Sequence, residues 1–539
     1  MTDTLNFAQV RQHLIDRTEI ALLDVREEDP FAQAHPLWAA NLPLSRIELD
    51  AWRRIPRRDT LLVVYGEHDG VDLAPLAAQR LAALGYTQVR LLDGGLAGWR
   101  AAGGELFRDV NVPSKSFGEL VEHERHTPSL SAQDVKALID SRADVVLLDA
   151  RRFDEYQTMS IPTATSVPGA ELVLRARALA PDPATQVVVN CAGRTRSIIG
   201  TQSLVNAGLP NPVAALRNGT IGWKLAGQQL DHGAARQAPA PSDVQRAAAQ
   251  ADARRVAERA GVRWVRLDAL PSLEAPGRTV YRFDVRTPQE YEAGHIDGFA
   301  SAPGGQLVQE TDHQVPVRGA RIVLADDDGV RAAMSASWLA QMGWDVHVVD
   351  ILAKDAASAH AAFGVKGGAP ALHAPEPAAV EVSPAQLSQW LAESPSMVAV
   401  IDVTTSANHV KRHIPGAWFA IRAQLAQALD RVPPVPRWVL TCGSSLLARF
   451  AARDLRALLD ARGIDAEVHV LAGGNAAWFA AGLPSEAGEQ RLATPRTDRY
   501  RRPYEGTDAP PEAMQAYLDW EFGLVEQLAR DGTHHFHVI

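Results

Sequence analysis

Short apolar runs that end in an acidic residue recur four times along the chain, closing at Asp24, Asp149, Asp284 and Asp402. About forty residues after each comes a second apolar run, followed by a short polar turn and a stretch with helical periodicity. A short continuous apolar run bounded by turn residues is typical of a strand buried in a parallel sheet. Such strands alternating with helical stretches predict an α/β fold, a mainly parallel sheet flanked by helices in each repeat.

The spacing of the repeats predicts four tandem domains. The residue directly after the second apolar run is Gly66, Cys191, Asp326 and Cys442 in turn, at separations of 125, 135 and 116 residues. These separations are ordinary domain sizes. We place the domains at residues 5–105, 129–233, 262–352 and 380–485, and a C-terminal tail at 488–539 with one helical run from Pro511 to Ala529.

The composition is that of a folded protein of several domains. A chain of 539 residues is too long for one hydrophobic core, and 46% hydrophobic with 22% charged residues is ordinary for a folded protein. The formal net charge of -10 does not favour binding to nucleic acid. We find no apolar span of about 18 residues and no signal-peptide pattern near the start of the chain. We therefore expect a cytoplasmic protein that binds neither membrane nor nucleic acid.

The only two cysteines are Cys191 and Cys442, in different repeats. Two cysteines cannot supply a disulfide framework for a chain of this size, and a four-ligand zinc site would need histidines at spacings that the sequence lacks. We expect neither a metal nor a cofactor. A lone intracellular cysteine is most often a small buried apolar residue, so each has to be judged by its neighbours.

The loop after the second apolar run of the second repeat carries the candidate chemistry. It reads Cys191, Ala192, Gly193, Arg194, Thr195, Arg196 and Ser197, and it leads into a helical stretch. The carboxyl end of a parallel strand is where open α/β sheets bind ligands. Free N–H groups of the loop and of the helix N-terminus, together with Arg194 and Arg196, favour an anion here and are expected to lower the thiol pKa from about 8.5 toward neutrality.

These features resemble the rhodanese family of sulfurtransferases, arranged as a tandem array over nearly the whole chain. The 191–197 segment matches the family's active-site loop, the acid-closed strands match its first motif, and segments such as Gly219 with Trp223 match its carboxyl-terminal motif. The resemblance implies a persulfide on Cys191, formed from a donor such as thiosulfate and passed to cyanide, a thiol or a protein acceptor. Planar guanidinium groups suit oxyanions, so Arg194 and Arg196 are candidates for binding the donor's sulfonate.

Asp149 and Arg151 follow a strand of the same repeat and are expected to form an ion pair that supports the loop. Two alternatives to sulfur-transfer turnover stay open. One is a sulfur-carrier or regulatory scaffold protein that accepts sulfur without turning over. The other is a cysteine phosphatase or arsenate reductase, which the loop disfavours because those families place arginine six positions after the cysteine, where this chain has Ser197.

The other repeats depart from this loop. Asp326 replaces the cysteine in the third repeat, and a longer thiol-free loop begins at Gly66 in the first, so we expect both to be inactive. The resemblance implies that the first repeat packs against the second and walls its pocket. Cys442 keeps the thiol in the fourth repeat but has Leu447 where the second repeat has Arg196, which makes it a second candidate site of uncertain role.

Overall fold

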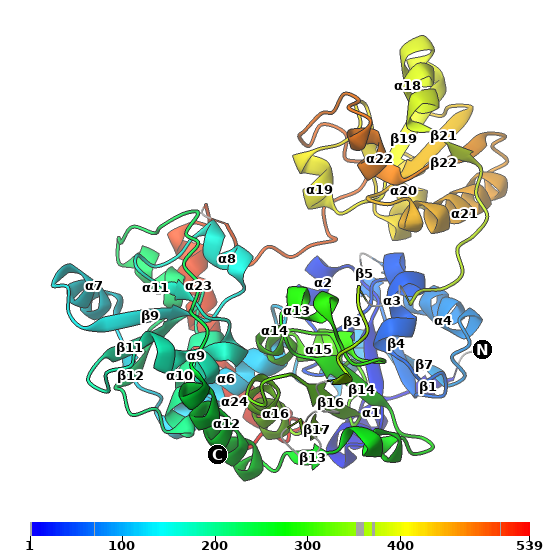
Figure 1. Cartoon of the computed structure of the whole chain (residues 1–539). Coiled ribbons are helices and arrows are strands. Elements are labelled where there is room, and N and C mark those ends of the chain that lie inside the picture. The colour runs from blue at the N-terminus through cyan, green and yellow to red at the C-terminus, as the bar shows by residue number, and fades with distance from the viewer. Residues whose placement is uncertain (1–2, 69, 352–360, 369–371, 507) are drawn as a thin grey trace.

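The computed structural model describes residues 3–68, 70–351, 361–368, 372–506 and 508–539 (Figure 1). The end of the third predicted domain at residue 352 lies outside the described residues. Each predicted repeat contains a five-stranded sheet, and every pair of neighbouring strands in these sheets is parallel. The predicted α/β fold is confirmed.

The strands of the four sheets follow one order: counted within each sheet along the chain, 1-5-4-2-3. In the first domain these are β1 (Thr4–Leu5), β2 (Ala21–Asp24), β3 (Ala39–Asn41), β4 (Leu62–Tyr65) and β7 (Val89–Leu92). In the second they are β8 (Ser129–Leu130), β9 (Val145–Asp149), β10 (Thr165–Ser166), β11 (Gln186–Asn190) and β12 (Val213–Leu216).

The third sheet contains β13 (Arg263–Val265), β14 (Val280–Asp284), β15 (Ala300–Ser301), β16 (Arg321–Ala325) and β17 (Asp345–Val349). The fourth contains β18 (Glu381–Val382), β19 (Val398–Asp402), β20 (Trp418–Phe419), β21 (Arg437–Thr441) and β22 (Glu467–Leu471). The fourth strand of each sheet lies at its centre. A residue directly after that strand therefore emerges from the middle of the sheet edge.

Helices and short 3₁₀ turns (η) lie between the strands and cover the sheets. The first domain has α1 (Phe7–Asp16), α2 (Glu28–Gln33), η1 (Leu44–Arg46), α3 (Ile47–Arg54), α4 (Ala74–Ala83) and α5 (Gly95–Ala101), with an antiparallel hairpin of β5 (Glu67–His68) and β6 (Val71–Asp72). The second has α7 (Ala132–Asp140), α8 (Phe153–Thr158), η2 (Gly169–Glu171), α9 (Leu172–Leu179), α10 (Thr195–Ala207) and α11 (Gly219–Leu225).

The third domain has η3 (Leu267–Leu273), α13 (Pro288–Ala293), α14 (Gly304–Gln309), α15 (Thr311–Gln314) and α16 (Arg331–Gln341). The fourth has α18 (Pro384–Glu393), η4 (Pro395–Met397), α19 (Ser406–Lys411), η5 (Arg422–Gln424), α20 (Leu425–Leu429), α21 (Leu446–Ala461) and α22 (Gly474–Ala480). Linker helices α6 (Val112–Arg125) and α12 (Asp243–Arg259) join the first domain to the second and the second to the third. None of the helices in the described part of the chain is long and apolar enough to cross a bilayer.

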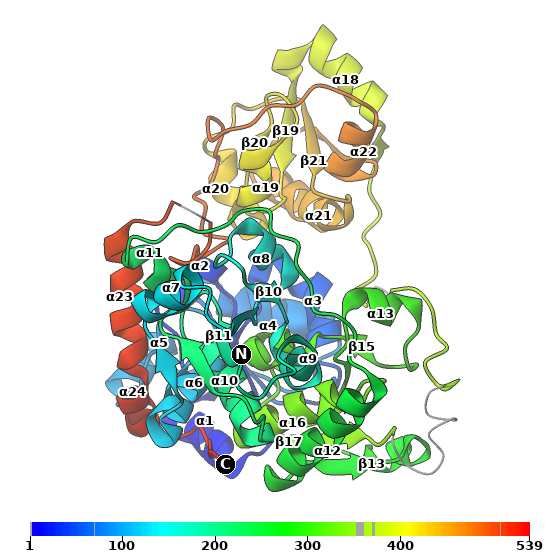
Figure 2. The same ribbon diagram turned by 60° about the vertical axis from the view of Figure 1, so that its left-hand side comes forward.

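The second domain packs on the third, and the first packs on both the third and the fourth. Trp338 of α16 donates a hydrogen bond to Ser203 of α10 at 2.9 Å, and the Tyr281 hydroxyl of β14 donates to the carbonyl of Arg54 of α3 at 2.7 Å. Between the first and fourth domains, Arg422 of η5 forms an ion pair with Glu48 of α3 at 2.7 Å. One hydrophobic core runs through the first three domains, whereas the fourth has cores of its own and stands apart in Figure 2.

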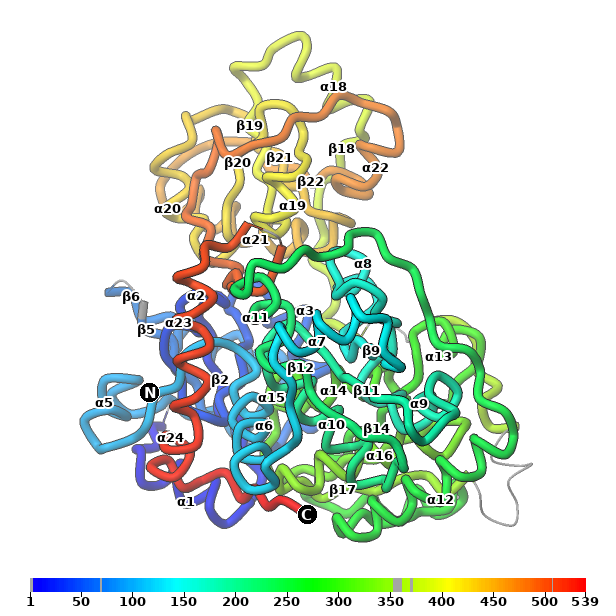
Figure 3. The backbone as a smooth tube through the Cα atoms, turned by 90° about the vertical axis from the view of Figure 1, so that its left-hand side faces the viewer, coloured from blue at the N-terminus to red at the C-terminus, as the bar shows by residue number. Residues whose placement is uncertain are grey.

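The C-terminal tail returns from the fourth domain and crosses the first three (Figure 3). The predicted single helix is two, α23 (Pro511–Phe522) and α24 (Leu524–Asp531), because the helix is interrupted at Gly523. Helix α23 packs on α6 and α11, and α24 packs on α6. The end of the chain lies between the first and third domains, where the Trp38 indole donates to the carbonyl of Thr533 at 3.3 Å.

Candidate active site

Cys191 directly follows β11, the central strand of the second sheet, and its loop leads into the N-terminus of α10. The carbonyl of Cys191 accepts a hydrogen bond from the N–H of Thr220 at 2.9 Å, and the carbonyl of Ala192 accepts one from Ile221 at 3.0 Å. A side chain at Gly219 would clash with the Cys191 carbonyl, so glycine is required at that close approach. The N–H groups in the first turn of α11 thus donate to carbonyls of the loop and fix its curvature.

The third domain shows what the same loop does with an electronegative side chain. Asp326 stands in the position of Cys191, and its carboxyl oxygens accept hydrogen bonds from the N–H groups of Gly329 at 3.0 Å and Ala332 at 2.8 Å. These donors are the third and sixth residues after Asp326, which correspond to Arg194 and Ser197. The loop amides of this fold therefore point inward, toward the side chain in the cysteine position.

The Cys191 thiol is buried, with 2% of the residue exposed, and it donates to Ser197 Oγ at 3.4 Å. Burial raises the thiol pKa above its ordinary value, while the charge of Arg196 and hydrogen bonding with the side chain and backbone of Ser197 lower it. The net direction is upward, which corrects the expectation of a lowered pKa. Loss of solvation outweighs Arg196 and Ser197 because almost none of the residue is in contact with solvent.

Arg194 is held by glutamates rather than facing a donor. Its guanidinium forms an ion pair with Glu119 of α6 at 2.7 Å and a further ion pair with Glu122 of the same helix. Phe522 of α23 packs against it, with the ring centroid 4.3 Å from the guanidinium carbon. This arrangement disfavours the expected binding of the sulfonate by Arg194, because its guanidinium nitrogens are paired with Glu119, Glu122 and Asn218 and Phe522 covers one of its faces.

Arg196 forms a bidentate ion pair with Glu155 of α8, at 2.7 and 2.8 Å. Burial opposes ionisation of Glu155, yet the charge of Arg196 and its hydrogen bonds bring the carboxyl pKa down to about 2. Arg196 also lines a cavity of about 350 Å³ that has five arginines and four acidic residues on its walls: Arg151, Arg152, Arg196, Arg499, Arg502, Asp154, Glu155, Glu310 and Glu505. Arg196 is the residue of the 191–197 loop that lines this cavity.

Asp149 and Arg151 form the expected ion pair at 2.7 Å, and both are buried. Asn190, the residue before Cys191, donates to Asp149 at 3.0 Å. Arg151 also donates to the carbonyl of Met159 at 2.6 Å. The pair therefore connects the end of the central strand to the segment after α8 and supports the loop.

The remaining site residues predicted from the sequence lie on the outer faces of the Cys191 loop. Thr195 packs against α6, where a side chain on Gly118 would lie 3.0 Å from its methyl group. Gly193 faces the tail, and a side chain there would lie 3.2 Å from the ring of Tyr517 and 3.5 Å from the Glu521 carboxylate. The linker helix and α23 therefore enclose the loop. The expected wall from the first domain is wrong for this pocket, because the neighbouring domain that contributes to it is the third, through Gln306 and Gln309.

Glu521 is a buried carboxyl beside the loop. Its Oε1 accepts a hydrogen bond from the Tyr517 hydroxyl at 2.8 Å, and its Oε2 has no hydrogen-bond partner. Burial and the negative charge of Glu119 raise the carboxyl pKa from 4.5 to about 8, although Lys115 and Arg194 oppose the shift. Glu521 is thus mostly protonated at neutral pH.

This pKa predicts a pH-dependent stability. Between about pH 4.5 and 8 the folded protein holds a proton on Glu521 that the unfolded chain releases, so the free energy of unfolding falls as pH rises, by up to about 1.4 kcal/mol per unit. Glu521→Gln keeps a neutral side chain of the same shape. We expect the difference in Tm, variant minus parent, to be larger at about pH 9 than at about pH 6.

The matched control is Glu512→Gln, which changes an exposed glutamate of the same helix. Its difference in Tm from the parent should be the same at both pH values. An equal response of the two variants to pH would show that Glu521 is ionised in the folded protein and would contradict the assignment.

The comparisons with known proteins agree with this geometry. The family model described as a rhodanese-like domain matches residues 7–102, 131–226, 273–351 and 383–481. The chain belongs to the rhodanese family. A search among curated proteins found no match.

One solved structure is similar over its full length. It is a thiosulfate sulfurtransferase from Pseudomonas aeruginosa, 64% identical, with 100% of both chains covered and a TM-score of 0.95. The Alr3790 protein from Anabaena sp. is 26% identical over 20% of this chain and 84% of its own, with a TM-score of 0.19. The first comparison therefore extends to all four rhodanese domains and the tail.

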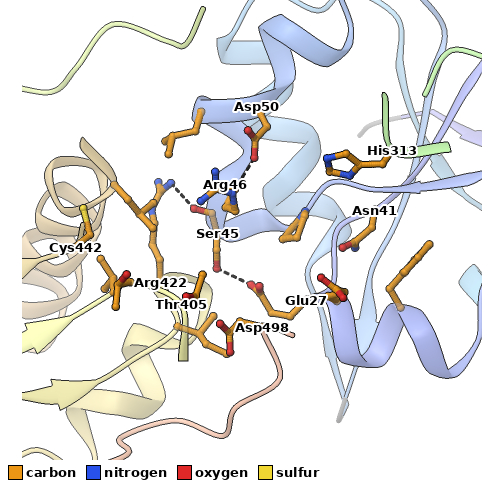
Figure 4. A pocket seen from close by; sticks show the side chains of 18 of the residues that line it. Glu27, Asn41, Ser45, Arg46, Asp50, His313, Thr405, Arg422, Cys442 and Asp498 are labelled. Atoms are coloured by element: carbon orange, nitrogen blue, oxygen red, sulfur yellow. Dashed lines mark hydrogen bonds and ion pairs between the residues drawn. The ribbon is translucent and has the colours of Figure 1, made fainter. Parts of the chain in front are cut away.

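Cys442 lies in a loop of the same construction in the fourth rhodanese domain. Its carbonyl accepts from the N–H of Asn475 at 2.7 Å, as that of Cys191 does from Thr220. Arg449, the nearest arginine after Cys442 in sequence, forms ion pairs with Glu376 and Glu381. Cys442 lines a cavity of about 650 Å³ between the first and fourth domains, to which the third domain and the tail also contribute (Figure 4).

Glu155 is a site residue that the sequence analysis missed. It lies six residues after Asp149, and Glu290 lies six residues after Asp284. Glu290 pairs with Arg331 at 2.7 Å, and Arg331 corresponds to Arg196. The two repeats with arginine at this loop position are also the two with glutamate at that helix position, and this correlation is visible in the sequence. The described residues contain no group of three or more side chains suited to hold a metal ion.

Proposed function

We propose that the protein is a sulfurtransferase that carries sulfane sulfur as a persulfide on Cys191, with thiosulfate as the donor. The similar protein from Pseudomonas aeruginosa bears the name thiosulfate sulfurtransferase. The Cys191 thiolate attacks the outer sulfur of thiosulfate and forms a new S–S bond. The bond between that sulfur and the sulfonate sulfur breaks, and its electron pair leaves with sulfite. Cyanide or a thiolate then attacks the outer sulfur of the persulfide, and Cys191 recovers its thiolate.

The observation that carries this proposal is the set of inward-pointing amides around the cysteine position. In the third domain they bind the carboxyl of Asp326. In the second domain the N–H of Ser197, which corresponds to Ala332, lies beside the Cys191 sulfur and favours negative charge on its thiolate and persulfide. Because these donors are already oriented by the contacts between the loop and α11, stabilising the anion needs no rearrangement of the loop.

Arg196 is the residue proposed to bind the sulfonate. It stabilises the Cys191 thiolate through its charge, and it lines the cavity of about 350 Å³ beside the loop. Its pairing with Glu155 offsets the donor's attraction, so binding thiosulfate means sharing the guanidinium between two anions. Other arginines of the cavity, Arg499 and Arg502 from the tail among them, help to draw a dianion in.

Thiocyanate formation from thiosulfate and cyanide tests the proposal, together with intact-mass detection of the persulfide after thiosulfate alone. We expect one sulfur on Cys191, release of one sulfite per chain, and turnover when cyanide is added. A stable persulfide without turnover would favour the sulfur-carrier protein. Absence of any persulfide would overturn the proposal.

A further inference from the structure

The cavity in front of Cys442 contains two buried side chains of opposite charge that are not joined. Arg54 is 2% exposed, and its Nη2 has no hydrogen-bond partner. Asp312 is 7% exposed, and its Oδ1 has none. Each shifts the pKa of the other, yet no ion pair connects them. A buried guanidinium and a buried carboxyl that are left partly unsatisfied in a cavity wall are suited to a ligand that brings both missing partners.

The other contacts of Arg54 hold it in place for such a ligand. Its Nε donates to the carbonyl of His313 at 2.8 Å and its Nη1 to the carbonyl of Asn41 at 2.6 Å. Only Nη2 is left to receive an anionic group. Burial raises the pKa of Asp312 to about 7, so a cation beside it would favour the carboxylate. The pair thus fits a carboxylate and an ammonium group carried close together on one molecule.

Cys442 lies across the cavity from this pair. Figure 4 shows Cys442 and His313 on opposite sides, and His313 is the neighbour of Asp312 on α15. The volume of about 650 Å³ exceeds what thiosulfate needs and suits a molecule of several linked groups. The Cys442 loop also has Leu447 in place of an arginine, so it lacks the charge that a dianionic donor requires.

We propose that this cavity binds the hydropersulfide of a small zwitterionic thiol and that Cys442 takes its outer sulfur. The inference rests on the proposed function, since it extends persulfide chemistry to a second thiol. The Cys442 thiolate attacks the outer sulfur of R–S–SH and forms the new S–S bond. The bond between R–S and that sulfur breaks, the electron pair leaves on R–S⁻, which takes a proton from water, and the proton on the outer sulfur remains there.

The two cysteines therefore serve different donors. Cys191 has Arg196 beside it for a compact dianion, and Cys442 has Arg54 and Asp312 across a larger cavity for a zwitterion. The cavities adjoin, because Asn111, Glu310 and Arg502 line both. The two cavities therefore share part of their walls.

The test uses the full-length Cys191→Ser variant, in which Cys442 is the only thiol. The probes are glutathione hydropersulfide, 3-mercaptopropionate hydropersulfide, which lacks the ammonium group, and thiosulfate. Intact mass followed in time reports the persulfide. We expect the first probe to label Cys442 at least about tenfold faster than either of the others. Equal rates with the first two probes, or no labelling by the first, would overturn the proposal.

Two further variants in the same background test the recognising pair. Asp312→Asn keeps the shape of the side chain, and Arg54→Met removes the guanidinium. Each variant is expected to slow labelling by glutathione hydropersulfide about tenfold. Asp312→Asn is expected to leave labelling by 3-mercaptopropionate hydropersulfide unchanged. If Arg54→Met fails to fold, Asp312→Asn decides alone. An unchanged rate with Asp312→Asn would contradict the assigned site.

A separate arm distinguishes this inference from the proposed function. Cys442→Ser, Arg54→Met and Asp312→Asn in the protein with Cys191 intact should keep thiosulfate turnover, because Arg54 and Asp312 do not line the cavity beside Arg196. Failure of Cys442 to be labelled, with turnover retained, would contradict only the proposed second site. Failure of thiosulfate to label Cys191 would contradict the proposed function itself.

Discussion

Replacing Cys191 by serine is expected to abolish thiocyanate formation from thiosulfate and cyanide, a loss of at least about 10⁴-fold. Serine keeps the size of the side chain and its hydrogen bond with Ser197, so the loop should keep its form. A hydroxyl oxygen cannot carry a transferable sulfane sulfur. Thiocyanate detected as its iron complex measures the turnover, and thermal unfolding verifies that the variant is folded.

Cys442→Ser is the matched control, because it makes the same substitution at the corresponding position of another rhodanese domain. It should leave kcat/KM for thiosulfate within about twofold of the parent. If turnover survives in Cys191→Ser and disappears in Cys442→Ser, the roles of the two thiols are reversed. The cavity beside Arg196 would then serve a different purpose.

Replacing Arg196 by leucine is expected to raise the KM for thiosulfate and to lower kcat/KM about 10- to 100-fold, the range for a lost hydrogen bond to a charged partner. An uncharged organic trisulfide as donor should lose much less. Rates with both donors at several concentrations separate binding from chemistry. Equal losses with charged and uncharged donors would contradict the binding role.

The structure adds a complication, since Arg196→Leu also removes the bidentate partner of the half-buried Glu155 carboxylate. The double variant Arg196→Leu with Glu155→Gln removes that charge as well. It should recover stability and still bind thiosulfate poorly. Arg331→Leu removes the corresponding arginine of the third domain, where there is no cysteine, and should leave kcat/KM unchanged.

The repeats and their sheets could be predicted because parallel strands leave a local pattern. The apolar runs of β9 and β11 are buried on both faces by helices, so their hydrophobicity is continuous and can be read from the sequence. The position of Cys191 follows from the same pattern, since the loop comes directly after the central strand. The role of Asp149 and Arg151 was accessible for the same reason, because the two are neighbours in the chain.

The partners of the loop could not be predicted, because they come from segments distant in sequence. Glu119 lies on a linker helix, and Glu521 lies near the end of the chain. Their contacts with Arg194 and Gly193 decide how buried the loop is. The charge of Arg194 and Arg196 could be read from the sequence, but the loss of solvation that outweighs it could not. The pKa of Cys191 therefore moved in the direction opposite to the one expected.

The packing of the domains also could not be predicted, because the sequence of a repeat does not show which other domain it contacts. Short linkers suggest that consecutive domains pair, yet Ser45 of η1 accepts a hydrogen bond from the N–H of Ala423 in the fourth domain at 3.0 Å. The first domain thus forms part of the cavity of Cys442 rather than that of Cys191.

The position of α23 over the Cys191 loop affects how the protein is made. A ribosome releases the tail last, so the second domain emerges and folds before Tyr517 and Glu521 exist to cover Gly193. Until α23 is made, Gly193 and the outer face of the Cys191 loop stay uncovered on that side. A chain that stops before residue 511 would fold its second domain without this cover.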